Sequence, residues 1–222
     1  MSSRSYHTLI ASLPPLPPRF DVERDPISRP RLEQRLRMLE EEDAAVIEQW
    51  TGFLVWDRQP LDRTDEEFIA MHDGLMNEIS NPTLREMIQI RIDTRTIISA
   101  VRRRRAGLPP PIGVGQWVEH IKRNYNEPEF NLSGRYSWIG ELDRLLAAGN
   151  AMEAQRLLFG TNYTQWSRMA EHHTFSFETI LLYLARWEII DRWTSRDAGA
   201  GQARFESILS ETLGDYAQLF QQ

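Results

Sequence analysis

A single long helical pattern constrains the fold of this chain more than any other feature. It begins at Asn81-Pro82, continues through IRIDTRTIISAVRRRRAGL at residues 90–108, and ends at Gly107, just before three prolines. Proline fits the first turn of a helix, and glycine fits the position just past the last turn. The pattern therefore predicts one long helix between these two signals.

The predicted helix carries charged residues inside its apolar face. With about 100° of rotation per residue, Arg91, Arg95 and Arg102 fall near the middle of that face, and Asp93 points the opposite way. An unpaired buried charge is strongly destabilising, so each arginine must extend its head group to solvent or meet a carboxylate. The apolar residues of this face are Leu84, Met87, Ile88, Ile98 and Val101.

The segment FSFETILLYLARWEIIDRW at residues 175–193 offers carboxylates in a matching position. It reads as a helix with apolar residues on most sides, which is typical of a buried central helix, and Glu188 and Asp191 share one of its apolar faces. We predict that the two helices pack together through a structural ion pair of Arg91 or Arg95 with Glu188 or Asp191. A catalytic or ligand-binding use of these charges is the alternative.

The long helix ends in a run of four arginines, Arg102, Arg103, Arg104 and Arg105. They cannot all face inward, so we expect at least Arg103 and Arg104 to be solvated. Cations at a helix C-terminus compensate the helix dipole, which is a purely structural use. Docking of an acidic protein partner is the second interpretation, and binding of nucleic acid or anionic lipid is the third. The four arginines are our candidate protein interface.

Helical signals also dominate the rest of the sequence, and evidence for strands is scarce. Residues 1–27 form a Pro-rich N-terminal segment, in which Tyr6 to Leu13 is either a short edge strand or a helix and LPPLPPRF is extended. Two helical halves follow, residues 28–107 and 113–222. No repeat with a period of 20 to 50 residues is evident. We therefore predict an all-α multi-helix bundle that forms a single domain over residues 1–222.

Local signals mark the starts of individual helices. Ser28 can cap a helix that runs through LEQRLRMLEEE, and Asp43 can cap the next one. Thr64 with Glu67 has the spacing of a capping box. Gly149, with the asparagine that follows it, divides two helices later in the chain.

Composition disfavours several classes of function. Asp and Glu number 32 against 26 Lys and Arg, giving a net charge of −6, whereas nucleic-acid-binding surfaces are basic. The chain has no cysteine, which excludes disulfides, thiol catalysis and thiolate metal sites. The apolar run before the first prolines is too short for a signal peptide, and ILLYLA is too short to span a bilayer. We expect a cytoplasmic protein that reaches the membrane only through partners.

Motifs for chemistry are weak. His172 and His173 diverge by about 100° on a helix and lack HExxH spacing, so we predict no metal site. GVGQW lacks the third glycine of a dinucleotide loop, no phosphate-binding GxxxxGK[ST] occurs, and no nucleophile motif is present. We therefore predict no catalytic residue, no cofactor and no enzymatic activity. PPLPPR resembles a ligand of SH3-type domains, but a stiff connector is the expected use.

The long helix resembles one that recurs in the C subunit of V-type and A-type ATPases, which is the d subunit of the eukaryotic enzyme and is called the d subunit below. That pattern runs Asp, then Asn three residues later, an apolar stretch, a basic Arg-Lys group and Gly. Asp93, Arg102 and Gly107 match it, and Thr96 stands where the pattern has Asn.

The chain is also similar to a smaller bacterial family of uncharacterised proteins found with V-type ATPase genes. Members of that family begin with a segment like YxxLIASLP, matched by Tyr6 to Pro14. They also carry a late segment like the one at residues 175–193, followed by RFESIL. These matches occur in the expected order and span most of the chain.

The resemblance implies an all-helical fold related to part of the d subunit. It also implies a non-catalytic subunit or accessory protein of a rotary ATPase, with central-stalk and membrane-ring subunits as its partners. The d subunit acts there as a socket between shaft and ring. Two alternatives stay open: a free-standing helical adaptor or assembly factor, and an enzyme with a pocket around Arg91, Arg95 and Glu188.

Overall fold

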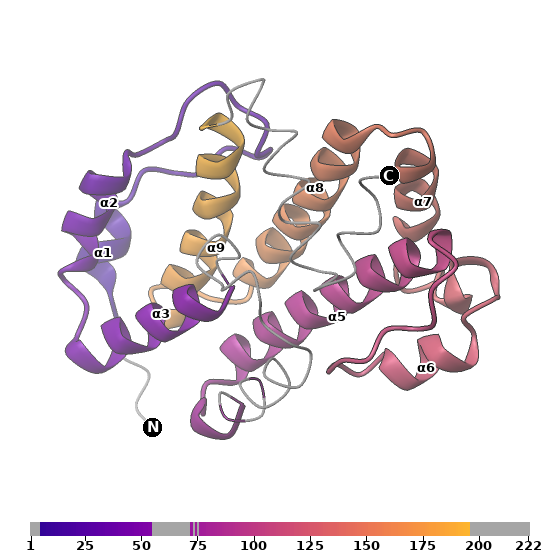
Figure 1. The fold of residues 1–222 in the computed structure, drawn as a ribbon. Coiled ribbons are helices and arrows are strands. Elements are labelled where there is room, and N and C mark those ends of the chain that lie inside the picture. Colours follow the sequence, from indigo (N-terminus) through magenta and orange to yellow (C-terminus); the bar gives the residue numbers. More distant parts are fainter. Residues whose placement is uncertain (1–4, 55–71, 73, 75, 196–222) are drawn as a thin grey trace. The chain divides into compact units, whose positions relative to one another are not determined.

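The computed structural model describes residues 5–54, 72, 74 and 76–195 of the 222-residue chain (Figure 1). Within these ranges the backbone is mostly α-helical and contains no strand, which confirms the all-α prediction. An isolated antiparallel bridge joins Ser5 and Ser176. The predicted capping box of Thr64 and Glu67 lies outside the described residues. The relation to the d subunit fold stays a prediction.

By its internal contacts the chain forms two compact units. Unit 1 comprises Met1–Phe53 and Gln155–Gly201, and unit 2 comprises Leu54–Ala154 and Gln202–Gln222. Each unit combines segments from both predicted halves, and the single-domain prediction stays a prediction. The helical elements of the described residues are α1 (His7–Ser12), α2 (Arg29–Leu36), α3 (Glu41–Leu54), α5 (Pro82–Arg105), α6 (Val118–Arg123), the 3₁₀ helix η2 (Pro128–Asn131), α7 (Ile139–Ala147), α8 (Ala151–Ala170) and α9 (Phe177–Thr194).

Helix α9 supplies much of the core of unit 1. Its apolar residues are buried around most of its circumference, as the sequence predicted. Aromatic rings from elsewhere in the unit join this core, and Phe20 packs edge-on against Trp193 with ring centroids 5.0 Å apart. The buried residues of α9 are Phe177, Ile180, Leu181, Leu182, Tyr183, Leu184, Ala185, Trp187, Ile189 and Ile190.

The Pro-rich segment packs against α8 and α9 within unit 1. The Tyr183 hydroxyl donates to the Pro14 carbonyl at 3.0 Å, and the Tyr163 hydroxyl donates to the Pro17 carbonyl. Before the prolines, the segment from Tyr6 to Leu13 contains the helix α1, His7–Ser12, and not an edge strand. The described strand-like pairing near it is the isolated bridge between Ser5 and Ser176. Two carbonyls of the segment are thus bonded inside the protein, and its use as a connector stays a prediction.

The predicted helix after Ser28 is shorter than expected. Ser28 occupies the N-cap position without a side-chain bond, and α2 stops at Leu36. Tight turn bonds from Met38 and Leu39 to carbonyls three residues back close the end of the helix before α3 begins. Asp43 lies inside the first turn of α3 and accepts a hydrogen bond from the Tyr6 hydroxyl, so the prediction of an Asp43 cap is wrong.

Helix α5 is the longest described element, and it organises unit 2, where it packs against α6 and α7. The Asn81 side chain accepts a bond from the Leu84 amide at 2.9 Å, which confirms the predicted start. At the other end Gly107 has a φ of 68°, and the Leu108 amide reaches back to the Arg103 carbonyl at 2.8 Å. This is a Schellman motif, which confirms the glycine as the helix terminator.

Residues 128–131 form the short 3₁₀ turn η2. Glu129, Phe130 and Asn131 all have positive φ, between 51° and 56°, which side-chain-bearing residues rarely adopt. Phe130 is fully buried, and this burial offsets the strain of the turn. Farther on, Gly149 with a φ of 66° separates α7 from α8, as predicted. No helix of the described residues has the length and apolar character needed to cross a membrane.

Candidate functional site

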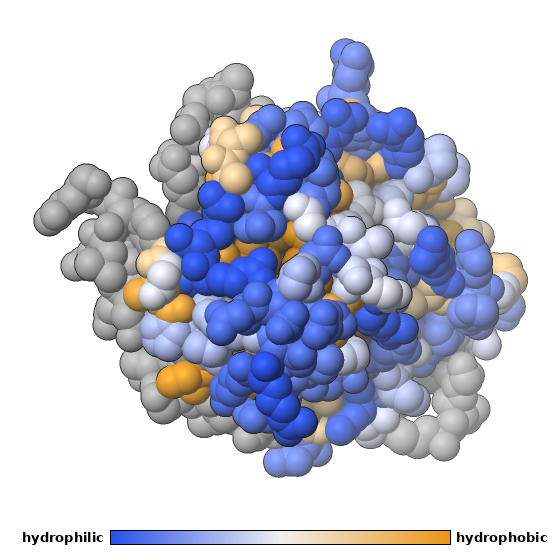
Figure 2. Space-filling view, turned by 90° about the vertical axis from the view of Figure 1, so that its right-hand side faces the viewer, coloured by the Kyte–Doolittle hydropathy of each residue, from blue (hydrophilic) through white to orange (hydrophobic). Residues whose placement is uncertain are grey.

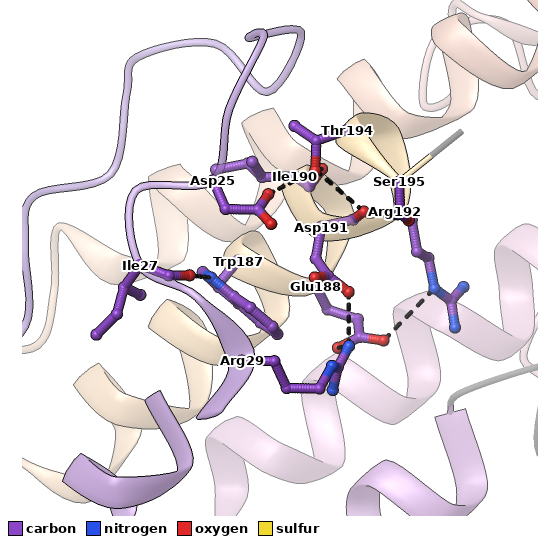
Figure 3. A network of polar contacts seen from close by, with 10 residues as sticks. All are labelled: Asp25, Ile27, Arg29, Trp187, Glu188, Ile190, Asp191, Arg192, Thr194 and Ser195. Carbon is purple, nitrogen blue, oxygen red and sulfur yellow. Dashed lines mark hydrogen bonds and ion pairs between the residues drawn. The ribbon is translucent and has the colours of Figure 1, made fainter. Parts of the chain in front are cut away.

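In unit 1 the two acids predicted for ion pairing, Glu188 and Asp191, meet an arginine from α2 (Figure 3). The Arg29 guanidinium lies 2.6 Å from Asp191 Oδ2 and 3.4 Å from Glu188 Oε2. On the other side of Glu188, Arg192 Nε lies 3.5 Å from Oε1, one turn along α9. Two carboxylates are thereby matched by two guanidinium groups.

Neighbouring residues fix the orientation of Arg29. Its guanidinium carbon lies 4.8 Å from the centroid of the Trp187 ring, in cation–π geometry. The Trp187 indole nitrogen in turn donates to the Ile27 carbonyl at 2.9 Å. Burial alone would lower the pKa of Arg29, but the Asp191 hydrogen bond and the charges of Glu188 and Asp191 outweigh it, so its pKa is raised. The cluster stabilises the start of α2 against α9.

Sequence reasoning did not identify Arg29. It lies 159 residues before Glu188, at the first position of a helix, and no periodic pattern points to it. Arg91 and Arg95 are half-buried on α5, and α5 belongs to unit 2. Their predicted pairing with Glu188 or Asp191 would join the two units, and it stays a prediction.

In unit 2 the arginine run is more buried than predicted. Arg103 is a buried residue whose Nε donates to the Pro109 carbonyl at 2.8 Å, so the prediction that it is solvated is wrong. The chain turns back sharply after Gly107, which brings this carbonyl over the last turn of α5. Arg102 is half-buried, and desolvation lowers its pKa to about 10.

The other two arginines of the run share one carboxylate. Arg105 lies 3.3 Å from Asp143 on α7, and Arg104 lies 3.9 Å from the same side chain. Arg104 also donates to the Glu127 carbonyl at 2.8 Å and sits 4.4 Å from the Phe130 ring centroid. It is half-buried rather than solvated, because it also packs on this ring. Most of the run therefore has a structural use inside unit 2.

Residues 108–117 connect α5 to α6, and we call them the 108–117 loop. Side chains of α5 also bind the end of this loop that lies next to α6. Asp93 accepts from the Gln116 amide at 3.0 Å and from the Gln116 side chain at 2.7 Å. One turn before, Gln89 donates to the same carboxylate at 2.9 Å. The Thr96 hydroxyl donates to the Val114 carbonyl at 3.1 Å. Asp93 thus lies off the predicted apolar face, but it is fully buried under this loop.

The loop approaches the carboxylate closely at Gly115. Its φ is 124°, and a Cβ atom there would lie 2.6 Å from Asp93 Oδ1. Desolvation raises the pKa of Asp93, and the bonds from Gln116 and Gln89 together with the Arg135 charge oppose that rise without cancelling it. On the loop side, the donors of Gln116 and the backbone of Gly115 lie against the carboxylate.

Asp93 and Arg103 are the two charged residues that are buried in the described ranges, and both bind the same loop. Tyr125 adds a bond from its hydroxyl to the Leu108 carbonyl at 3.0 Å. The arrangement holds a loop in one conformation; it presents no nucleophile paired with a base. No cluster of His, Asp or Glu in the described part of the chain could hold a metal ion.

Residues 63–213 match the family described as "Protein of unknown function (DUF2764)". This is more than half of the 222-residue chain. The chain belongs to the DUF2764 family. The DUF2764 region contains α5, the 108–117 loop and both acids of α9, but not Arg29. No curated protein and no solved structure matches the chain.

Proposed function

We propose that this protein is a non-catalytic subunit or accessory protein of a V/A-type rotary ATPase, similar to the d subunit. In this role it couples the central stalk to the membrane ring, and it contacts the membrane only through ring subunits. The proposal starts from the resemblance of α5 to the recurring helix of the d subunit.

One observation in the structure supports this proposal most. Three positions of the pattern act on one structural element: the matching residues Asp93 and Gly107, and Thr96, which replaces the Asn of the pattern. Asp93 and Thr96 bind the 108–117 loop, and Gly107 turns the chain into it. A pattern shared by chance would not be expected to act on a single loop. Thr96 can do this in place of Asn because its hydroxyl also donates a hydrogen bond.

The mechanical role needs stiffness and interface area rather than a reactive group. Buried charges with matched partners fix the register of the elements that they join. In unit 1, Arg29 holds the carboxylates of Glu188 and Asp191, which favours a structural use of these acids over the enzyme alternative. In unit 2, the hydrogen bonds of Asp93, Thr96 and Arg103 hold the 108–117 loop in a defined conformation against α5.

The proposal is tested by affinity purification of the tagged full chain from its native cells in gentle detergent, with mass spectrometry of the co-eluting chains. We expect recovery of ATPase stalk and ring subunits in near-stoichiometric amounts, and none with the tag alone. Recovery of the tagged chain without any ATPase subunit would overturn the proposal and leave the free-standing adaptor.

A further inference from the structure

The 108–117 loop presents an exposed apolar side chain near its middle. Ile112 is 59% exposed, the largest exposure of any large hydrophobic residue in the described ranges. It directly follows three consecutive prolines, residues 109–111, whose fixed φ angles stiffen the backbone. An isolated exposed isoleucine is ordinary on a protein surface, so the surroundings of the loop decide whether this one has a use.

Both ends of the loop are fixed by polar contacts from inside unit 2. Before Ile112, Arg103 and Tyr125 hold the carbonyls of Pro109 and Leu108; after it, Thr96 and Asp93 hold Val114 and Gln116. Burying a charge is costly unless it is well paired. The buried charged side chains of Asp93 and Arg103 both form hydrogen bonds with the backbone of this loop. We infer that these bonds hold the loop in a defined conformation.

A preformed loop is suited to binding. Ordering a flexible segment weakens association, and a rigid segment avoids that cost. Interfaces concentrate their binding energy in a few side chains that fill pockets on the partner. Ile112 on a clamped, proline-stiffened loop has the properties of such an anchor. On the face that Figure 2 turns to the viewer, hydrophilic residues predominate and hydrophobic ones show in smaller areas.

The charges near the start of the loop indicate the chemistry of the partner. Among the described residues, Arg104 and Arg105 share the carboxylate of Asp143, so two guanidinium groups face one carboxylate where the chain leaves α5. Arg104 lies near the loop, since it contacts the Tyr125 carbonyl at 3.4 Å and the Tyr125 hydroxyl binds Leu108. A complementary surface therefore offers an apolar pocket with carboxylates beside it.

We propose that the 108–117 loop is a docking element that inserts Ile112 into an apolar pocket, flanked by carboxylates, on a subunit of the rotary ATPase. This inference rests on the proposed function, because it names the surface through which that assembly is made. A single side chain is too small to anchor the protein in a bilayer, so a protein pocket fits the loop better than a lipid surface.

The test compares variants of the tagged full chain in the same affinity purification. Ile112→Asp and the milder Ile112→Ala remove the anchor, and Arg105→Glu reverses one charge near the loop. Met38→Asp is the matched control, because Met38 is also an exposed apolar residue, at 41%, but lies in unit 1. Thermal unfolding by circular dichroism checks that each variant keeps the helical content and midpoint of the wild type.

We expect Ile112→Asp to lower recovery of ATPase subunits at least tenfold, with smaller losses for Ile112→Ala and Arg105→Glu and none for Met38→Asp. Wild-type recovery by folded Ile112→Asp would overturn the docking inference and leave the proposed function standing. Failure of the wild type itself to recover ATPase subunits would overturn both. Self-association of the purified wild type that Ile112→Asp abolishes, seen by light scattering, would replace the ATPase pocket by a second copy of this chain.

Discussion

At the residue scale, Gly115 occupies a position that other residues fit poorly. Its backbone has a φ of 124° and passes directly over the Asp93 carboxylate. Side chains rarely adopt this φ, and the carboxylate cannot retreat because three hydrogen bonds from Gln116 and Gln89 hold it. Conformation and contact therefore both require glycine here.

We predict that Gly115→Ala destabilises the protein by about 2 kcal/mol. The loss combines backbone strain with weaker hydrogen bonds from Gln116 and Gln89 to Asp93. Urea unfolding followed by circular dichroism measures the change. Two glycines of unit 2 serve as controls. Gly134 has open space around it, so Gly134→Ala is expected to be nearly neutral. Gly107 has positive φ but no atom near the place that a methyl group would occupy, so Gly107→Ala should cost about half as much.

An equal loss of stability in Gly115→Ala and Gly107→Ala would show that the contact with Asp93 contributes nothing. In that case the requirement for glycine at position 115 would come from its backbone conformation alone.

At the scale of elements, the start of α2 is tied to α9 by Arg29. We predict that Arg29→Met lowers stability by about 1–2 kcal/mol, because it leaves Glu188 and Asp191 near each other without their shared cation. This loss is smaller than that expected for breaking a fully buried ion pair, because the Arg29 side chain is 41% exposed and solvent screens it. Arg31→Met is the control, since Arg31 lies exposed on the same helix.

A double-mutant cycle of Arg29→Met and Asp191→Asn measures the interaction energy between Arg29 and Asp191, as the coupling between their effects on the free energy of unfolding. Coupling with Arg29→Met is expected, and its absence would refute the pairing of Arg29 with Asp191. The same cycle with Arg91→Met and Arg95→Met tests the ion pair predicted from the sequence. Coupling there would mean that the acids of α9 also interact with α5.

The elements themselves could be predicted where local chemistry decides them. Asn81-Pro82 and Gly107 bound α5 because caps and terminators act on adjacent residues. The early stop of α2 and the left-handed turn at residues 129–131 could not be predicted, since turn bonds and the burial of Phe130 decide them. The position of Glu188 and Asp191 inside an apolar stripe of α9 predicted ion pairing. The identity of the cation depends on tertiary packing, which places Arg29 beside both carboxylates.

The same contrast holds for the arginine run and Asp93. Four successive charges suggested solvation, yet Arg103 is buried because the prolines fold a carbonyl back onto it. Helical geometry placed Asp93 away from the main apolar face, but only the path of the 108–117 loop shows that the opposite side is also covered. Loop paths depend on contacts distant in sequence, so periodicity cannot give them.

At the scale of the whole molecule, two carboxylates make its stability respond to pH in opposite directions. The raised pKa of Asp93 in unit 2 means that its contribution is present at low pH and is lost as pH rises through the folded-state pKa. Asp21 in unit 1 behaves the other way. Hydrogen bonds from Arg19 and then Arg156 lower its pKa to about 2, against the opposing effect of burial.

For Asp21 the depressed pKa means that its contribution is complete above about pH 4, the usual pKa of the unfolded group, and disappears as pH falls towards 2. We predict that Asp21→Asn loses about 1 kcal/mol at pH 7, a modest value because solvent screens the exposed Arg19 and Arg156. The difference from the wild type should shrink steadily between pH 4 and pH 2. Urea unfolding at pH 7, 5, 3 and 2 measures it.

Glu23→Gln is the matched control for Asp21→Asn, because it removes a carboxylate two residues away on an exposed side chain. It changes the net charge equally, so a general charge effect would appear in both variants. A gap between Asp21→Asn and the wild type that stays constant down to pH 2 would contradict the assignment. The stabilisation would then come from side-chain packing, which does not titrate, and not from the ion pairs of Asp21 with Arg19 and with Arg156 of α8.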